Sequence, residues 1–322
     1  MEEIKKIKLP GVSFEVSQIC LGTAYLGSRE DENASFEIMD AYYERGGRFL
    51  NTAHEYGDGG SERVIGKWIR ERGIQRDDIV ITSKCGEDDS RPEFRAMHAE
   101  ELFEDIDESL ARSGLDHFDF YELHIDDVTV GVGEIMDAMN EIRRQGKIRY
   151  YGCSNWSAER QKEAAGYADK RGIDSFRIDE IEMNLTHLNV DNNSCHCKWL
   201  DREYAEYHKS AGMAVGAYSP IANGVLTKYL RDGDTRSWKP HQINTYSNDR
   251  NFETAKRIGR LAAETGYSPT AIQMAWHLSQ PYGFVSFPII GARNVEQLSD
   301  SLSCLECRFQ PDMADYLTPA EE

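Results

Sequence analysis

A tyrosine, a lysine and a histidine are the residues of this sequence best suited to acid–base chemistry. Lys84 closes the apolar run 79–83, His124 closes the run 118–123, and Tyr56 follows Asn51, the last residue of a third run. A phenol has a pKa of about 10 and is a poor acid near neutral pH unless a neighbouring cation stabilises its phenolate. Lys84 would supply that cation, so the three side chains together would move a proton to or from a substrate oxygen.

Polar residues also stand at the ends of several other apolar runs. They are Asn51, Ser154 with Asn155, Glu180 or Glu182, and Tyr218 with Ser219. Each one alone is compatible with a structural role, because strand ends are hydrated, and a lone histidine such as His124 is more often structural than catalytic. Their joint occurrence on so many runs favours one shared functional site.

The runs that carry these residues alternate with segments of helical period. The eight runs span residues 18–21, 48–51, 79–84, 118–124, 150–154, 176–183, 214–219 and 284–288. Between them apolar residues recur at helical spacing, as at Leu102, Ile106 and Leu110 and again at Ile135, Met139 and Ile142. Eight such pairs predict repeated βα units around a parallel sheet.

Two doubly wound domains would also alternate strands and helices, but neither a linker nor a compositional shift divides the chain. We therefore predict an α/β fold in which a single (β/α)8 TIM barrel occupies residues 1–322 as one domain. The segment Lys6 to Phe14 contains Pro10 and Gly11 and predicts an N-terminal β-hairpin that closes the bottom of the barrel. The irregular stretches 184–198 and 223–251 follow strands, which places them at the C-terminal face where barrel enzymes hold their sites.

Composition narrows the class of protein further. The 322 residues contain 37 Lys and Arg against 56 Asp and Glu, a net charge of −19 that disfavours nucleic acid and anionic membranes as partners. No run approaches the roughly 18 to 20 apolar residues of a membrane span, and the first six residues lack the apolar core of a signal peptide. Seven cysteines in such a chain indicate reduced thiols. We expect a soluble, cytoplasmic protein.

Six short blocks resemble the aldo-keto reductase superfamily in order and spacing, over nearly the whole chain. They are NTAHEYGDGGSE at 51–62, ITSK at 81–84, DFYELH at 119–124, GKIRYYGCSNWS at 146–157, AYSP at 217–220 and IGAR at 290–293. The resemblance implies a nicotinamide-dependent oxidoreductase that interconverts a carbonyl, an aldehyde or ketone, and an alcohol. It also implies that Tyr56 is the proton donor, Lys84 lowers the pKa of Tyr56, and His124 orients the carbonyl.

The same resemblance implies a cofactor site, with Ser154 and Asn155 on the nicotinamide carboxamide and Tyr218 stacked on the ring. The implied cofactor residues are Gly22, Thr23, Asn51, Ser154, Asn155, Glu180, Tyr218, Ser219, Ile221, Asn223, Gly291, Arg293 and Gln297. Arg293 precedes the last predicted helix, which starts near Val295, so it is well placed to meet a ribose phosphate. Gln297 stands where many family members have a second arginine. We favour NADP(H) and keep NAD(H) as the alternative.

Two residues depart from the family pattern. Asn51 stands where the family has an aspartate beside the lysine, and Glu180 stands where a glutamine binds the carboxamide. With no anion beside it, Lys84 would lower the pKa of Tyr56 further, and the pKa of Lys84 itself would fall. Asn51→Asp would then move the pH profile of reduction upward, unless Glu180 or Glu182 already supplies the charge from across the barrel.

The substrate is expected to be a small carbonyl or alcohol compound, with a sugar-derived carbonyl as the leading subclass. Aromatic rings face sugar carbons and carboxylates accept hydroxyl hydrogen bonds. Tyr25, His54 and Trp156 are the predicted substrate contacts, in loops that also carry Glu55, Asp126, Asp127, Trp238 and Tyr246. A solvated loop explains Asp126 and Asp127 equally well.

Three other interpretations were weighed. The run Gly57 to Gly60 lacks the lysine and spacing of a phosphate loop, so a plain turn before a helix is predicted there. Cys195, His196 and Cys197 lie at the opposite end of the predicted barrel from Cys304 and Cys307, so no metal site is expected. The alternative function is a nucleotide-binding barrel with weak catalysis that acts as a redox-sensing or regulatory subunit.

Overall fold

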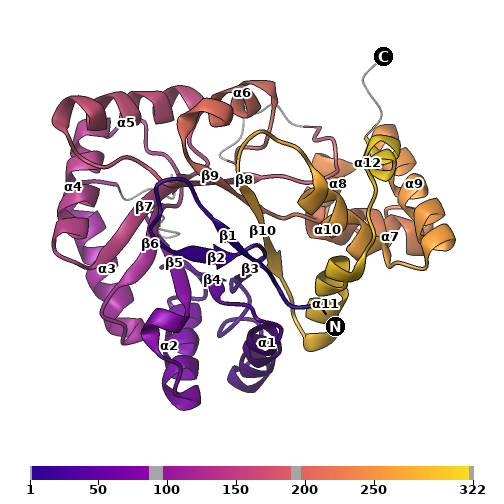
Figure 1. Cartoon of the computed structure of the whole chain (residues 1–322), viewed down its shortest axis with the longest axis horizontal. Helices are drawn as coiled ribbons and strands as arrows, with labels where there is room; N and C mark the ends of the chain where they lie inside the picture. The colour runs from indigo at the N-terminus through magenta and orange to yellow at the C-terminus, as the bar shows by residue number, and fades with distance from the viewer. Residues whose placement is uncertain (1, 87–96, 190–196, 319–322) are drawn as a thin grey trace.

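A computed structural model, which describes residues 2–86, 97–189 and 197–318, contains a closed barrel of eight parallel strands (Figure 1). The strands follow one another around the barrel in chain order, and β10 pairs with β3 to close it. Each of the eight predicted runs overlaps one strand, so the predicted (β/α)8 barrel is confirmed. The strands are β3 (Cys20–Gly22), β4 (Phe49–Asn51), β5 (Val80–Cys85), β6 (Phe118–Leu123), β7 (Ile148–Ser154), β8 (Ile178–Glu182), β9 (Ala214–Tyr218) and β10 (Ser286–Gly291).

Helices surround the barrel and bury their apolar stripes against it. Ile106, Ile135 and Met139 have no exposed surface, which confirms the helical spacing seen in the sequence. The helices of the first six units are α1 (Glu32–Glu44), α2 (Gly60–Arg72), α3 (Ala99–Ser113), α4 (Val132–Arg144), α5 (Ala158–Arg171) and α6 (Arg202–Ala211). Those that follow are α7 (Val225–Asp232), α8 (Pro240–Tyr246), α9 (Asp249–Thr265), α10 (Pro269–Ser279), α11 (Val295–Leu302) and α12 (Pro311–Leu317), and three short 3-10 turns complete the set.

The stretch 223–251 differs from its prediction as an irregular loop, because it contains α7 and α8. Both are short, and their apolar residues pack with those of α9 in a second buried cluster that includes Val225, Tyr246 and Ile258. A helix of seven or eight residues spans only about two turns, too few for its period to stand out in sequence. The helix at Val295 is not the last one, since α12 follows it and lies beside α9 (Figure 1).

The N-terminal hairpin closes one end of the barrel, as predicted. Strands β1 (Lys6–Lys8) and β2 (Glu15–Ser17) pair antiparallel, and the second begins just past the predicted segment. Between them, the ring of Phe14 packs edge-on against Phe120 and Tyr150, with centroids 5.7 and 5.8 Å apart. Apolar side chains fill this end, so polar chemistry is confined to the other end.

The barrel interior changes from apolar to polar along the strands. Phe49, Phe120 and Ile178 belong to the apolar cluster at the hairpin end, and the residues two positions further on are Asn51, Glu122 and Glu180. Two glycines make room for the carboxyl side chains. A Cβ at Gly216 would stand 3.0 Å from Cγ of Glu180, and one at Gly152 would stand 3.2 Å from Cγ of Glu122. The sequence therefore builds a buried polar layer directly beneath the barrel mouth.

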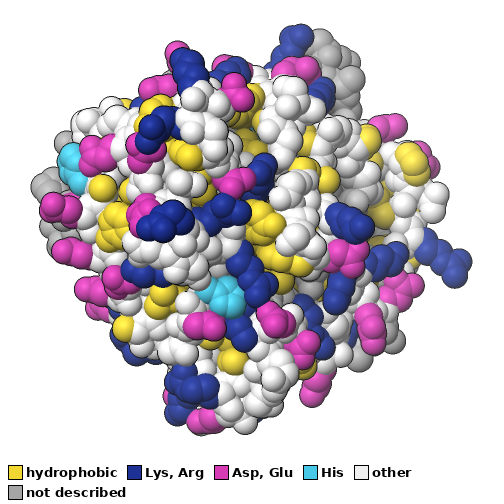
Figure 2. All heavy atoms as spheres, turned by 60° about the vertical axis from the view of Figure 1, so that its left-hand side comes forward, with side chains coloured by type: hydrophobic (Ala, Val, Ile, Leu, Met, Phe, Trp, Pro, Cys, Tyr) yellow, Lys and Arg dark blue, Asp and Glu magenta, His cyan; other side chains and the backbone are white. Residues whose placement is uncertain are grey.

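The surface carries both signs of charge. Figure 2 shows Lys and Arg side chains lying among Asp and Glu on one face, so the net charge of −19 does not form a continuous acidic field there. None of the helices in the described ranges has the length and apolar composition needed to cross a membrane.

Candidate active site

The structure brings Tyr56, Lys84 and His124 together at the mouth of the barrel. The Lys84 ammonium lies 5.1 Å from the centroid of the Tyr56 ring, and the Tyr56 and His124 rings meet edge to face at 5.6 Å. Lys84 is 1% exposed, whereas Tyr56 and His124 are half-buried. A buried cation thus lies below a phenol that solvent and ligands can reach.

Lys84 is held by three oxygen atoms. Its Nζ donates to Oδ1 of Asn51 at 2.6 Å and to the Thr52 carbonyl at 3.0 Å, and lies 3.4 Å from Oε2 of Glu180. Burial is the strongest single influence and acts to lower the pKa of Lys84, but the charges of Glu180, Tyr56 and Glu122 together outweigh it, so the pKa is raised above its usual value. Lys84 is therefore a permanent cation at neutral pH.

Glu180 is the carboxylate partner of Lys84, so the premise that this lysine lacks an anion is wrong. Both carboxylate oxygens of Glu180 face inward, one toward Lys84 and the other accepting a hydrogen bond from Nδ2 of Asn51. Protein groups contact both oxygens, and the cofactor role predicted for Glu180 stays a prediction. Glu182 does not share this role, since it accepts hydrogen bonds from Tyr246 and Asn184 instead.

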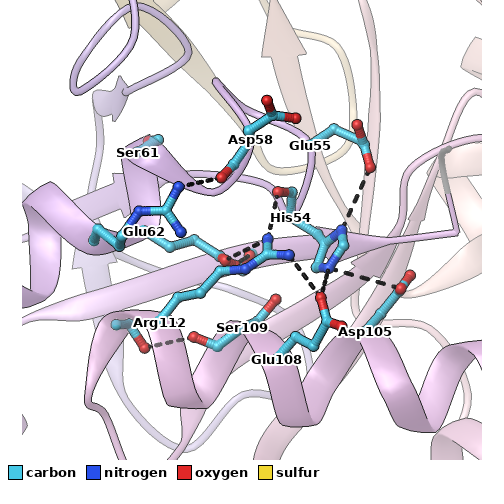
Figure 3. A network of polar contacts seen from close by, with 12 residues as sticks. His54, Glu55, Asp58, Ser61, Glu62, Asp105, Glu108, Ser109 and Arg112 are labelled. Carbon is cyan, nitrogen blue, oxygen red and sulfur yellow. Dashed lines mark hydrogen bonds and ion pairs between the residues drawn. The ribbon is translucent and has the colours of Figure 1, made fainter. Parts of the chain in front are cut away.

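The loop that carries Tyr56 is fastened to α3, as Figure 3 shows. The His54 imidazole lies 3.1 Å from Oε2 of Glu108 and 3.8 Å from Oδ1 of Asp105, and Arg112 donates to the His54 carbonyl at 3.0 Å. The His54 ring is directed at α3, and the substrate role predicted for it stays a prediction. The predicted turn before α2 is confirmed, with Gly57 and Gly59 at positive φ.

A buried hydroxyl cluster anchors the same loop to the first barrel strand. Oγ1 of Thr23 lies 2.6 Å from Oγ of Ser61 and donates to the Asn51 carbonyl at 2.9 Å, while Oγ1 of Thr52 donates to Ser61 at 2.8 Å. Thr23 has no exposed surface and its hydroxyl anchors the loop, while the cofactor role predicted for Thr23 stays a prediction. Sequence reasoning quoted Thr52 and Ser61 within the block at 51–62 but assigned no role to either.

Ser154, Asn155 and Tyr218 meet on the opposite half of the rim. Tyr218 donates to Oδ1 of Asn155 at 2.8 Å, and Nδ2 of Asn155 contacts both Oγ of Ser154 at 2.9 Å and the His124 carbonyl at 3.3 Å. Asn155 thereby links strand ends β6, β7 and β9. The catalytic candidates lie on β4 to β6 and these three residues on β7 to β9, so the two groups face one another across the mouth.

Backbone strain in the described ranges concentrates at this mouth. The non-glycine residues with positive φ there are Asp58, Asn155, Ser219, Ala222 and Asn223, and all five lie in loops that follow barrel strands. Such conformations cost of order 1–3 kcal/mol each and cluster at ligand sites. Ala222 was missed because alanine rarely adopts this conformation. Ile221 lies half-buried between Ser219 and Asn223 in the same loop, and all three are among the residues predicted to contact the cofactor.

The end of β10 carries the residues predicted to meet the ribose phosphate. Gly291 pairs with Gly22 across the closing strands, and a Cβ at Gly291 would meet nothing within 4 Å, so the backbone there is open. Arg293 is 60% exposed just before α11, but it donates to Glu30 at 2.7 Å. Gln297 accepts a hydrogen bond from the Arg293 backbone at 3.1 Å, so its side chain holds this turn.

The aromatic residues predicted near the substrate lie mostly in the core. Trp156 has no exposed surface and packs against Phe176 at 5.3 Å, and the substrate contact predicted for it stays a prediction. Trp238 and Tyr246 are buried in the cluster beneath α7 and α9. Tyr25 is half-buried, with the Arg29 guanidinium 4.7 Å above its ring, and is the predicted aromatic contact that keeps an accessible surface.

The described ranges contain no group of three or more His, Cys, Asp or Glu side chains arranged to hold a metal ion. Cys195 and His196 lie outside those ranges. Cys197 is exposed, and Cys304 is buried in the turn after α11.

Comparisons with known proteins agree with this geometry. The model of the aldo/keto reductase family matches residues 18–322. The chain is 29% identical to an uncharacterized oxidoreductase, YrpG, of Bacillus subtilis (strain 168), covering 94% of this chain and 91% of that protein. It is 27% identical to the NADP(+) aryl-alcohol dehydrogenase of Phanerodontia chrysosporium, covering 96% of this chain and 83% of that protein. It is 26% identical to a probable voltage-gated potassium channel subunit beta of Oryza sativa subsp. japonica, covering 94% of this chain and 90% of that protein.

The structure thus places a tyrosine above a buried lysine and beside a histidine at the mouth of a (β/α)8 barrel. The family match extends over nearly the whole chain, and the chain belongs to the aldo/keto reductase family. It is an NAD(P)H-dependent reductase that acts on small-molecule carbonyl substrates.

Proposed function

We propose that this reductase interconverts an aldehyde or ketone and the corresponding alcohol, with Tyr56 as the proton donor and NADP(H) as the preferred cofactor. The observation that carries the proposal is the buried Lys84 ammonium 5.1 Å from the centroid of the Tyr56 ring. A fixed cation at this position favours the phenolate, so the tyrosine gives up its proton more readily than a free phenol would.

Each side chain at the mouth has a separate part in this proposal. A nicotinamide cofactor, when bound, supplies the hydride. The Tyr56 hydroxyl donates a proton to the carbonyl oxygen as it becomes an alkoxide, and Lys84 stabilises the phenolate that remains. His124 lies beside Tyr56 at 5.6 Å between ring centroids and would orient the same oxygen. In the oxidising direction Tyr56 would accept the proton.

The opposite half of the rim suits a dinucleotide. Ser154 and Asn155 offer hydroxyl and amide groups of the kind that bind a carboxamide, and Tyr218 offers a ring beside them. Gly291 leaves its backbone open, and Arg293 precedes the N-terminus of α11, where an anion is favoured. Arg293 supports NADP(H), whereas its pairing with Glu30 favours the alternative, NAD(H).

A second candidate is a nucleotide-binding subunit with weak catalysis that reports the redox state of its cofactor. The likeness to a probable potassium channel subunit beta is the observation that favours it. The intact set of Tyr56, Lys84 and His124 favours the enzyme instead. The two proposals differ in one measurable quantity, the rate at which bound cofactor is oxidised when a carbonyl compound is added.

The test is a fluorescence titration with NADPH and with NADH, followed by a screen of carbonyl compounds. The screen contains aromatic aldehydes, aliphatic ketones and sugar aldehydes, the last of which tests the sugar-derived subclass. The reductase proposal expects tight NADPH binding and steady turnover with at least one class. Tight binding without turnover across the screen would favour the regulatory subunit.

A further inference from the structure

We propose that Glu180 is the counterion that sets the electric field of Lys84 on Tyr56, and that the Asn51 amide is the bridge that joins the two. Lys84 and Glu180 thus form a unit whose one negative charge comes from β8, on the opposite side of the barrel from Tyr56. The inference rests on the proposed function, because it concerns the pH at which Tyr56 holds its proton.

The contacts cross the interior of the barrel. Strand β8 pairs with β7 and β9, and not with β4 or β5, so Glu180 reaches Asn51 and Lys84 through the centre of the barrel. Gly216, on the neighbouring strand, leaves the space that this side chain occupies, because a Cβ there would stand 3.0 Å from Cγ of Glu180. In the described ranges, Glu180 is the carboxylate that lies within ion-pair distance of Lys84 Nζ.

The two hydrogen bonds of Asn51 fix which way its amide points. Oδ1 accepts from the Lys84 ammonium, and Nδ2 donates to Glu180. A carboxylate at position 51 could satisfy the first contact but would set an acceptor against the Glu180 carboxylate. The layer therefore accommodates one negative charge, at position 51 or at position 180, and a second carboxylate would be neutralised by a proton.

The other titratable groups that face this pair do not replace Glu180. Glu122, on β6, has no exposed surface, and its Oε1 accepts from Oγ1 of Thr82 at 2.6 Å. Burial, and then the neighbouring Glu180 charge, raise the pKa of Glu122 well above its usual value, which favours the protonated form of this carboxyl. Burial raises the pKa of the Cys20 thiol in the same way. Tyr56 is then the group that responds to the net charge of Lys84 and Glu180.

The experiment is a charge-exchange cycle with Glu180→Gln, Asn51→Asp and the double variant. Glu180→Gln leaves Lys84 without a carboxylate, so the pKa of Tyr56 should fall. The basic limb of the pH–rate profile for reduction should therefore move down by about one pH unit, and turnover at a pH on that limb should be about tenfold slower. Asn51→Asp alone sets two carboxylates together. The urea concentration at the midpoint of its unfolding (the urea midpoint) should therefore fall as the pH rises from 5 to 8. The double variant restores one charge and should recover both the parental limb and the parental midpoint.

Glu182→Gln is the matched control, because Glu182 is on the same strand and bonds Tyr246 and Asn184 rather than Lys84. It should show no coupling to Asn51→Asp. Purely additive effects of the two substitutions in the double variant, in both pH profile and urea midpoint, would overturn the inference. The urea unfolding measurements require no turnover. A parent protein without reductase activity would refute the proposed function, and the urea midpoints would still decide whether Glu180 balances the charge of Lys84.

Discussion

Replacing His54 by glutamine should loosen the loop that holds Tyr56, and the effect should depend on pH. The imidazole lies 3.1 Å from the Glu108 carboxylate and 3.4 Å from that of Glu55. Burial acts to lower the pKa of His54, but the hydrogen bond to Glu55 and the charges of Asp105 and Glu108 together raise it above 6.5. Folding therefore favours the charged imidazole, and its stabilisation is full below pH of about 6.5 and lost as the pH rises through the folded-state pKa.

The magnitude follows from the exposure of the partners. His54 is 13% exposed, Asp105 15% and Glu55 20%, but Glu108 is 59% exposed, so solvent screens the contact with Glu108. We assign about 1 kcal/mol of stabilisation to the charged contacts of His54. This value lies between the contribution of a surface ion pair and that of a buried charged hydrogen bond. For a chain of 322 residues that corresponds to a melting temperature lower by about 1–2 °C at pH 6, and to a smaller difference at pH 9.

The assay is thermal unfolding of the parent and His54→Gln at pH 6 and pH 9, together with kcat at both values. If the loop must be ordered for proton transfer, 1 kcal/mol corresponds to about fivefold in kcat at pH 6. His98→Gln is the control, since His98 also pairs with a carboxylate, Glu134, but belongs to the start of α3 and not to the Tyr56 loop. An equal loss of stability at both pH values would refute the idea that a charged His54 holds the loop.

Three further outcomes are expected. Arg293→Ala should raise the dissociation constant for NADPH by about tenfold and leave that for NADH nearly unchanged, because NADPH alone carries the ribose phosphate; equal changes would show that Arg293 meets no phosphate. Glu30→Gln should strengthen NADPH binding, since Glu30 pairs with Arg293 at 2.7 Å, and unchanged fluorescence titrations would contradict this. Glu122→Gln should raise the melting temperature more at pH 7.5 than at pH 5. A buried acid with a raised pKa destabilises the folded state by about 1.4 kcal/mol for each pH unit above 4.5, until the folded-state pKa is reached. The same gain at both pH values would show that Glu122 is ionised in the folded protein.

The sequence predicted the barrel well because its signal is local and repeated. Each βα unit carries an apolar run and a helical stripe, and eight units leave few other arrangements. Helices α7 and α8 were missed because they are short and pack in the buried cluster that includes α9 rather than on the barrel. The extent of the domain, residues 1–322, and the cytoplasmic location stay predictions.

The candidate site was predictable at strand ends and less so elsewhere. Lys84 and His124 end strands, where side chains must point at the mouth, and Tyr56 follows such an end. His54 and Trp156 lie in loops, where the direction of a side chain depends on tertiary partners such as α3 and Phe176. The pairing of Glu180 with Lys84 crosses the barrel between strands that are not neighbours, so sequence spacing could suggest it but could not decide between Glu180 and Glu182.

The most direct test of the account is single-turnover reduction by Tyr56→Phe, with the best carbonyl substrate from the screen and saturating NADPH. The variant lacks only the hydroxyl that would donate the proton, so turnover should fall by about 10²–10⁴-fold while the NADPH dissociation constant stays within about twofold of the parent. Turnover close to that of the parent, with NADPH bound equally well, would contradict the role of Tyr56 as proton donor.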